Sequence, residues 1–406
     1  MGRVFANLER VLDAPYRIFF FAAAVQVLIA SAWWAGVLAA RAGGVASALP
    51  AGLAPAQVHA FLMIYAFFPL FIFGFLYTAG PRWLARPAPQ RIQYALPAVV
   101  AGLAAAALLP AFHLGAGLAA MVVLVMLGAW GWMLGDIAVL IIASPVRDRL
   151  HPILAACALA VGLIGLAAAR VWLLTGSQAA VRVMESAGLW GFLVPLFVTM
   201  SHRMIPLFSG EAALARTIWR PSWVLAVLAG GSLVHGLLAF LQLPQWTWIV
   251  DAPMAAVATM LVWRWGFALS RANRLIAMMH IGYAWLALAL VIYALQSLAL
   301  LAGAHHFGLA PTHALAVGFL SSLTLAMVSR VSCGQSGRSL RGDRLTWAVF
   351  VVLQAAASAR VAADVLTGAY SMLLACAAAL WLASFMAWAW RYLPFYWEPS
   401  AERTPG

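Results

Sequence analysis

The chain has 406 residues, of which 66% are hydrophobic and only 9% are charged, and its formal net charge is +13. Soluble domains carry about a quarter charged residues, so the composition excludes a soluble protein and indicates a polytopic membrane protein. All 24 basic residues are arginines that lie between apolar runs. In a soluble protein such a basic balance would indicate nucleic-acid binding, but here it is an orientation signal, and we expect no nucleic-acid partner.

The apolar runs are long enough to be membrane-spanning helices, since a bilayer core requires about 20 apolar residues per helix. Clusters of Pro and Gly separate the runs. The sequence therefore predicts an all-α bundle of twelve transmembrane helices that forms a single integral-membrane domain over residues 1–406. The predicted spans are 17–40, 57–79, 92–111, 114–143, 152–175, 186–207, 222–243, 247–268, 275–301, 312–330, 345–366 and 370–393.

The distribution of arginines predicts the orientation of these helices. Placing the N-terminus in the cytoplasm puts about 20 arginines in cytoplasmic segments. Only Arg41 and Arg182 then lie in outward-facing segments. This asymmetry predicts an N-in, C-in topology.

Two histidines and two arginines share a depth near the outer face in this topology. His59 begins the second span and His313 begins the tenth, and both spans enter from outside. Arg170 and Arg360 lie inside the fifth and eleventh spans, toward their outer ends, where an arginine usually faces a partner or a polar cavity. Two neutral imidazoles can ligate a haem iron, and guanidinium groups pair with haem propionates. We therefore predict that the two histidines are axial ligands and that the two arginines lie near the propionates.

Each of these residues also has a simpler explanation. A histidine at a helix end usually hydrogen-bonds a carbonyl group or water at the interface. An arginine one turn from the interface can extend to water, and Asp364 is placed to form an i,i+4 ion pair with Arg360. Because the sequence gives depth without azimuth, it does not show whether the four side chains face one another.

Other groups near membrane depth have no assigned role. His235 lies within the seventh span, and Asp136, Glu185 and Asp251 are the acids of this region. Acid–histidine chains can carry protons, whereas a helix-end acid more often caps a helix or faces the interface. Two of the three cysteines lie in apolar runs without ligand spacing and are expected to be small core residues, namely Cys157 and Cys376.

Four blocks of the sequence, spread over nearly the whole chain, resemble one known family. The first contains HALAVG (His313 to Gly318), TLAMVSR (Thr324 to Arg330) and GQSGR (Gly334 to Arg338). The others are SHRMIPLFS (Ser201 to Ser209), HIGYAWLAL (His280 to Leu288) and APYRIFF (Ala14 to Phe20). These blocks resemble segments of the NnrS proteins, which are twelve-helix proteins of the bacterial inner membrane.

The resemblance implies a multi-pass inner-membrane protein that binds haem b in one or more copies. The family is also associated with copper and is linked to nitric oxide and nitrosative stress in denitrifying and related bacteria. The architecture resembles the catalytic subunit of haem–copper oxidases, in which histidines of helices 2 and 10 hold a haem beside an arginine pair. That second likeness is an analogy of fold.

The sequence departs from the family pattern at two places. Phe61 and Leu62 stand where the second helix of the family usually carries a histidine and a glutamate. Gln335 replaces a histidine in the loop after the tenth helix. The chain is therefore a divergent member that lacks polar groups suited to a second metal site.

Because of these two departures, the sequence does not decide whether the protein binds copper. Copper requires two or three imidazoles or thiolates held close together. His202 ends the sixth span and His280 begins the ninth, so both lie near the inner face, and Cys333 is the candidate third ligand. The candidate metal ligands are thus this inner histidine pair together with His59 and His313.

The leading hypothesis is a haem protein that binds or detoxifies nitric oxide or transfers electrons in that response, which leaves open whether it is an enzyme. With imidazole at both axial positions the iron has no open site, so electron transfer is expected unless one ligand dissociates. Expected partners are haem, nitric oxide, membrane lipids and a respiratory-chain protein. Two alternatives are an assembly factor for a respiratory complex and a cofactor-free transporter. For the transporter, Pro69 and Pro195 interrupt helices near mid-depth, but no repeat is evident.

Overall fold

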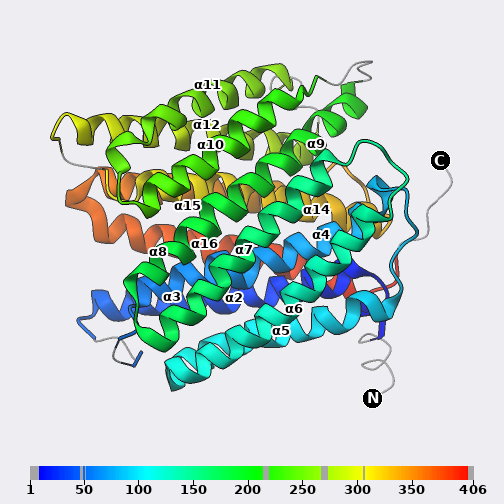
Figure 1. Cartoon of the computed structure of the whole chain (residues 1–406), viewed down its shortest axis with the longest axis horizontal. Helices are drawn as coiled ribbons and strands as arrows, with labels where there is room; N and C mark the ends of the chain where they lie inside the picture. The colour runs from blue at the N-terminus through cyan, green and yellow to red at the C-terminus, as the bar shows by residue number, and fades with distance from the viewer. Residues whose placement is uncertain are drawn as a thin grey trace. The chain divides into compact units, whose positions relative to one another are not determined.

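The computed structural model describes residues 9–45, 49–50, 52–213, 219–266, 273–304 and 307–400. All regular structure within these ranges is helical (Figure 1), which confirms the predicted all-α class. Two of the arginines on which the predicted topology depends, Arg216 and Arg271, lie outside these ranges.

Eleven segments of the described chain are long and apolar enough to cross a membrane. The remaining predicted span, the eighth at 247–268, forms α11 (Trp248–Arg264), which has 17 residues. At 1.5 Å per residue it is about 25 Å long, against a hydrocarbon core of about 30 Å. The count of twelve and the N-in, C-in topology stay predictions. The eleven segments are α2 (Pro15–Ala42), α3–η1–α4 (Pro55–Trp83), α5 (Arg91–Leu114), α6 (Ala116–Ile142), α7 (Leu150–Thr175), α8–η2–α9 (Gln178–Ser209, with α9 continuing to Ala213), α10 (Ser222–Phe240), α12 (Arg274–Leu301), α13–η5–α14 (Ala310–Gln335), α15 (Arg344–Val365) and η6–α16–α17 (Thr367–Trp397).

Most boundaries agree with the prediction to within a few residues, but the sixth span begins earlier than expected. It was expected from residue 186, and its first helix, α8, runs over Gln178–Ser186. The hydroxyl of Ser177 accepts a hydrogen bond from the backbone N–H of Ala180 and caps this helix. Arg182, which was expected in a connecting loop, is therefore helical. Because α8 is polar, a search for apolar runs does not find it.

Local chemistry fixes other helix ends as well. Asp343 accepts a hydrogen bond from the backbone N–H of Thr346 at 2.7 Å and caps α15. Asn273 does the same for α12 through the N–H of Leu275. At the end of α7, Gly176 has a φ of 70°, a left-handed conformation that glycine adopts without a steric penalty.

Three spans in the described part of the chain contain a π-helical stretch, a feature often found at functional sites. The stretches are η1 (Leu62–Phe67), η2 (Ala187–Leu193) and η5 (Ala314–Ser321). They lie in the second, sixth and tenth predicted spans, which are also the three spans with the largest buried share. A wider helical turn shifts the backbone hydrogen bonds, and side-chain hydroxyls donate to two carbonyl groups at or near these stretches. The hydroxyl of Tyr65 donates to the carbonyl of Met184 at 2.7 Å, and that of Ser321 donates to the carbonyl of Ala316 at 2.7 Å.

The chain consists of two compact units. In the first, α5 lies beside α6 and α6 beside α7; in the second, α10, α11 and α12 lie side by side (Figure 1). The prediction of a single domain is not tested by this division and stays a prediction. The first unit comprises Met1–Gly188, Arg330–Leu340 and Phe385–Gly406, and the second comprises Leu189–Ser329 and Arg341–Ser384.

The prediction that Cys157 and Cys376 are core residues was wrong, because both are exposed. The error has a physical cause. Lipid tails are as apolar as a leucine side chain, so a helix surface that faces lipid has the same composition as one that faces the core.

Candidate functional site

His313, in the second unit, is oriented by a hydrogen bond to the backbone. It is the last residue of α13 (Ala310–His313), directly before the π-helical stretch η5. Its Nδ1 lies 3.0 Å from the carbonyl oxygen of Leu309. Because a carbonyl oxygen only accepts, Nδ1 carries a proton, and in the neutral ring the lone pair lies on Nε2. Metal-ligating histidines are usually oriented this way. The simpler explanation, a helix-end histidine bound to a carbonyl group, predicts the same bond.

His59, in the first unit, also lies just before a π-helical stretch. It belongs to α3 (Pro55–Phe61), which leads into η1. Its ring stacks on the indole of Trp34 from α2, with centroids 4.1 Å apart and an angle of 10° between the planes. This contact covers one face of the imidazole and fixes the plane of the ring.

Arg170 belongs to the same unit as His59 and has an unsatisfied donor. Its Nε is buried and meets no hydrogen-bond acceptor among the described residues. Buried polar groups are nearly always hydrogen-bonded, so an unpaired guanidinium N–H suits an acidic group of a ligand. Helix α8 packs against both α3, which carries His59, and α7, which carries Arg170. Gln57 and Gln178 join α3 to α8 through a hydrogen bond of 3.0 Å.

Arg360 belongs to the unit of His313 and forms the ion pair that the simpler explanation predicts. Its Nη1 lies 2.8 Å from Oδ2 of Asp364, and the side chains are 9% and 8% exposed. One of the five N–H donors of the guanidinium meets this carboxylate. Helix α13 packs against α15, so the helices that carry His313 and Arg360 are neighbours.

The two histidines predicted near the inner face have separate partners. Nε2 of His202 lies 3.2 Å from the carbonyl oxygen of Pro221, and Nε2 of His280 lies 2.8 Å from Oγ of Ser209. Cys333, the candidate third copper ligand, belongs to the first unit, and its Sγ lies 3.9 Å from the hydroxyl of Tyr392. Within the described ranges, no group of three or more His, Cys, Asp or Glu side chains is arranged to hold a metal ion.

The blocks that carry the family resemblance pack against one another in the second unit. Gly318, of HALAVG, lies against the indole of Trp285, of HIGYAWLAL. The indole N–H of Trp285 donates to Oε1 of Gln354 at 2.7 Å, and Nε2 of Gln354 donates to Oγ of Ser322 at 2.8 Å. Gly282, on α12, permits close packing against α14, since a Cβ at position 282 would lie 3.1 Å from the Cβ of Ser322. These positions therefore hold α12 against the α13–η5–α14 span, which carries His313.

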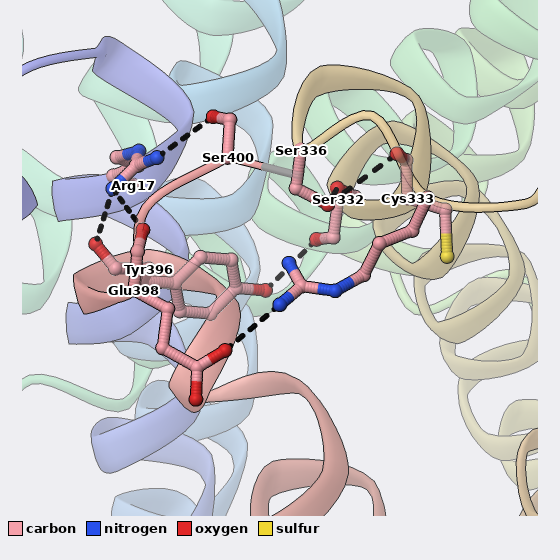
Figure 2. A network of polar contacts seen from close by, with 8 residues as sticks. Arg17, Ser332, Cys333, Ser336, Tyr396, Glu398 and Ser400 are labelled. Carbon is pink, nitrogen blue, oxygen red and sulfur yellow. Dashed lines mark hydrogen bonds and ion pairs between the residues drawn. The ribbon is translucent and has the colours of Figure 1, made fainter. Parts of the chain in front are cut away.

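In the first unit, Arg17 of APYRIFF binds the C-terminal segment (Figure 2). Its Nη1 donates to the carbonyl groups of Tyr396 at 3.2 Å and Glu398 at 3.0 Å, and its Nη2 donates to the hydroxyl of Ser400 at 3.2 Å. The hydroxyl of Tyr396 lies 3.0 Å from that of Ser332. Arg338, of GQSGR, forms an ion pair with Glu398 at 2.8 Å. Two of the family-like blocks thus meet the C-terminal segment through polar contacts.

One pairing was missed from the sequence. His235 and Asp251 were noted separately, and the structure joins them by a hydrogen bond of 2.7 Å. The two residues are 16 positions apart on different helices, α10 and α11. A short connection between two apolar runs predicts that the helices are neighbours, but not which faces meet.

The helical fold and its eleven candidate spans define a polytopic integral-membrane protein. The family model described as NnrS protein matches residues 10–400, nearly the whole chain. The chain therefore belongs to the NnrS family, as its sequence blocks indicated. No curated protein matches it.

Proposed function

We propose that this protein binds haem b in a bacterial inner membrane and acts in a nitric oxide response. In this proposal His313 and His59 are iron ligands, and Arg170 and Arg360 bind propionates. The pairing of the two histidines rests on their equal predicted depth, and no copper site is included.

The observation that carries the proposal is the hydrogen bond from Nδ1 of His313 to the carbonyl of Leu309. In the neutral ring it leaves the lone pair on Nε2, and it orients the ring, as expected of a histidine that would hold iron. The unpaired Nε of Arg170 supports it further, since a propionate would satisfy that donor. Arg360 contributes less, because Asp364 already binds its guanidinium.

The chain's own residues would have three tasks around such a group. His313 and His59 supply neutral imidazole nitrogens, and the stack of His59 on Trp34 orients one of the two rings. Arg170 would offset negative charge of the group. Haem supplies one-electron chemistry when bound, and its potential is set by axial ligands, hydrogen bonds and burial.

Absorption spectroscopy of the purified protein tests the proposal. We expect a Soret band, which should change little on brief exposure of the reduced protein to nitric oxide if both His59 and His313 hold the group. A large shift would mean that nitric oxide binds iron and would favour binding or detoxification over electron transfer. A protein without any Soret band would contradict the proposal.

A cofactor-free transporter is the second candidate, and one observation favours it. The π-helical stretches recur in the second, sixth and tenth predicted spans. Transporters commonly carry helix interruptions at matching positions of internal repeats. The missing Soret band that contradicts haem binding would leave this candidate as the better one.

A further inference from the structure

A buried acid–histidine pair joins two neighbouring helices of the second unit. Nδ1 of His235, on α10, lies 2.7 Å from Oδ1 of Asp251, on α11. The two residues are 3% and 0% exposed. Ionisable residues inside a membrane span are costly and usually functional, so the pair requires an explanation.

Aromatic rings enclose the imidazole of His235. The indole of Trp190 stacks on it, with centroids 3.5 Å apart and an angle of 25° between the planes. Tyr293, of α12, meets it edge-on with centroids 4.9 Å apart. The hydroxyl of Tyr293 is bound to Thr312 at 2.8 Å, so it is engaged away from the pair. The imidazole is thus held in position while its polar contact is with Asp251.

The second carboxylate oxygen of Asp251 is not satisfied. Oδ2 is buried and has no hydrogen-bond partner within the described part of the chain. A carboxylate beside a neutral imidazole gives the pair a charge of −1, and burial strongly disfavours such a net charge. Addition of one proton makes the pair neutral overall, either as imidazolium with carboxylate or as imidazole with carboxylic acid.

Other charges on the adjoining helices lie too far away to neutralise the pair directly. Arg182, on α8, is eight positions from Trp190, which is roughly 12 Å along the helix, and the other basic groups are at least 12 positions, or roughly 18 Å, from Trp190, Asp251 or Tyr293. Glu185, five positions before Trp190, adds no positive charge. The distant groups are His202 and Arg203 on α9, Arg264 on α11, and Arg274 and His280 on α12.

We propose that His235 and Asp251 form a proton-exchange site within the membrane. The pair takes one proton from water, with an N–H or O–H bond formed on the imidazole or the carboxyl group, and releases it when the surroundings become more basic. No electron is transferred and no other reactant is required. This function goes beyond haem binding and does not depend on it.

Infrared difference spectroscopy of the purified full-length protein, titrated from about pH 5 to about pH 8, tests the proposal. We expect bands of a carboxyl group and of a histidine ring that change together, the latter assigned with isotope-labelled histidine. Asp251→Asn should remove both changes, because the acid is lost and the imidazole loses its ionisable partner. Asp136→Asn, which removes a membrane carboxyl group bound to Tyr77 in the first unit, should leave them intact.

Two results would overturn the proposal. The first is a wild-type protein with no coupled carboxyl and histidine signal over this range. The second is the same signal in folded Asp251→Asn. If that variant does not fold, Asp251→Glu retains the acid and should shift the carboxyl band, and an unshifted band would equally contradict the assignment. The absence of haem leaves this test unaffected, so the two proposals can fail separately.

Discussion

Gly318 lies against the indole ring of Trp285, so close that a methyl group at position 318 would overlap the ring. The contact joins the HALAVG block to the HIGYAWLAL block. It explains why the span that carries His313 has a glycine five positions further along. The smallest side chain allows this helix to approach α12.

Gly318→Ala should therefore destabilise the protein. Overpacking of a well-packed interior costs about 1–3 kcal/mol, and the rigid indole has little room to move. We expect the protein in detergent to unfold at a lower temperature than wild type, with unfolding monitored by tryptophan fluorescence. Gly230→Ala is the matched control, because a Cβ at position 230 meets nothing within 4 Å. Equal stability of Gly318→Ala and wild type would show that the two helices are less closely packed.

Tyr65 offers a test of the π-helical stretches. Its hydroxyl donates to the carbonyl of Met184, just before η2. Tyr65→Phe removes one of two hydrogen bonds to that carbonyl, which also accepts from the backbone N–H of Ala187, and should cost about 0.5–1.5 kcal/mol. Tyr370→Phe, at an exposed position, should have no measurable effect on the same unfolding transition. An unchanged transition in Tyr65→Phe would mean that the backbone bond alone satisfies the carbonyl.

Variants of Arg360 and of its ion-pair partner Asp364 can distinguish a structural role of the arginine from a ligand-binding role. Removing one partner of a buried pair typically costs about 3–5 kcal/mol, so Arg360→Gln and Asp364→Asn should both unfold at lower temperature. If Arg360 also binds a propionate, only Arg360→Gln should lower the haem content per folded protein. Equal haem content in the two variants would assign the arginine to the ion pair alone.

Arg17 should control the accessibility of the C-terminal segment. Arg17→Gln loses hydrogen bonds to the carbonyl groups of Tyr396 and Glu398, so limited proteolysis should cleave this segment sooner. Arg91→Gln, at an exposed position, should be cleaved at the wild-type rate. Identical cleavage rates in all three proteins would show that other contacts hold the segment.

Much of the fold follows from the sequence because a membrane imposes a simple rule on length and hydrophobicity. That rule located eleven spans, but it did not find the polar helix α8, whose start depends on the cap at Ser177. Nor did it show that the helix faces that carry Cys157 and Cys376 are exposed. The stretch η5 has no proline inside it to signal the change of helical pitch.

The candidate site was harder to predict than the fold. The sequence indicates how deep a residue lies in the membrane, but not which direction it faces around the helix axis. The ion pair of Arg360 was foreseen, since i,i+4 spacing determines it locally. The bond between His235 and Asp251 was not, because it depends on how two helices are rotated. The π-helical stretches after His59 and His313 add a rotation that no regular helix would have.

Haem content provides the most direct test of the central claim. The measurement is a pyridine-haemochrome assay on purified wild type, His59→Ala, His313→Ala and the control His113→Ala, whose ring instead contacts Trp33. We predict haem in the wild type and the control, and a large loss in both ligand variants. Full haem content in His59→Ala and His313→Ala, or none in the wild type, would contradict the account.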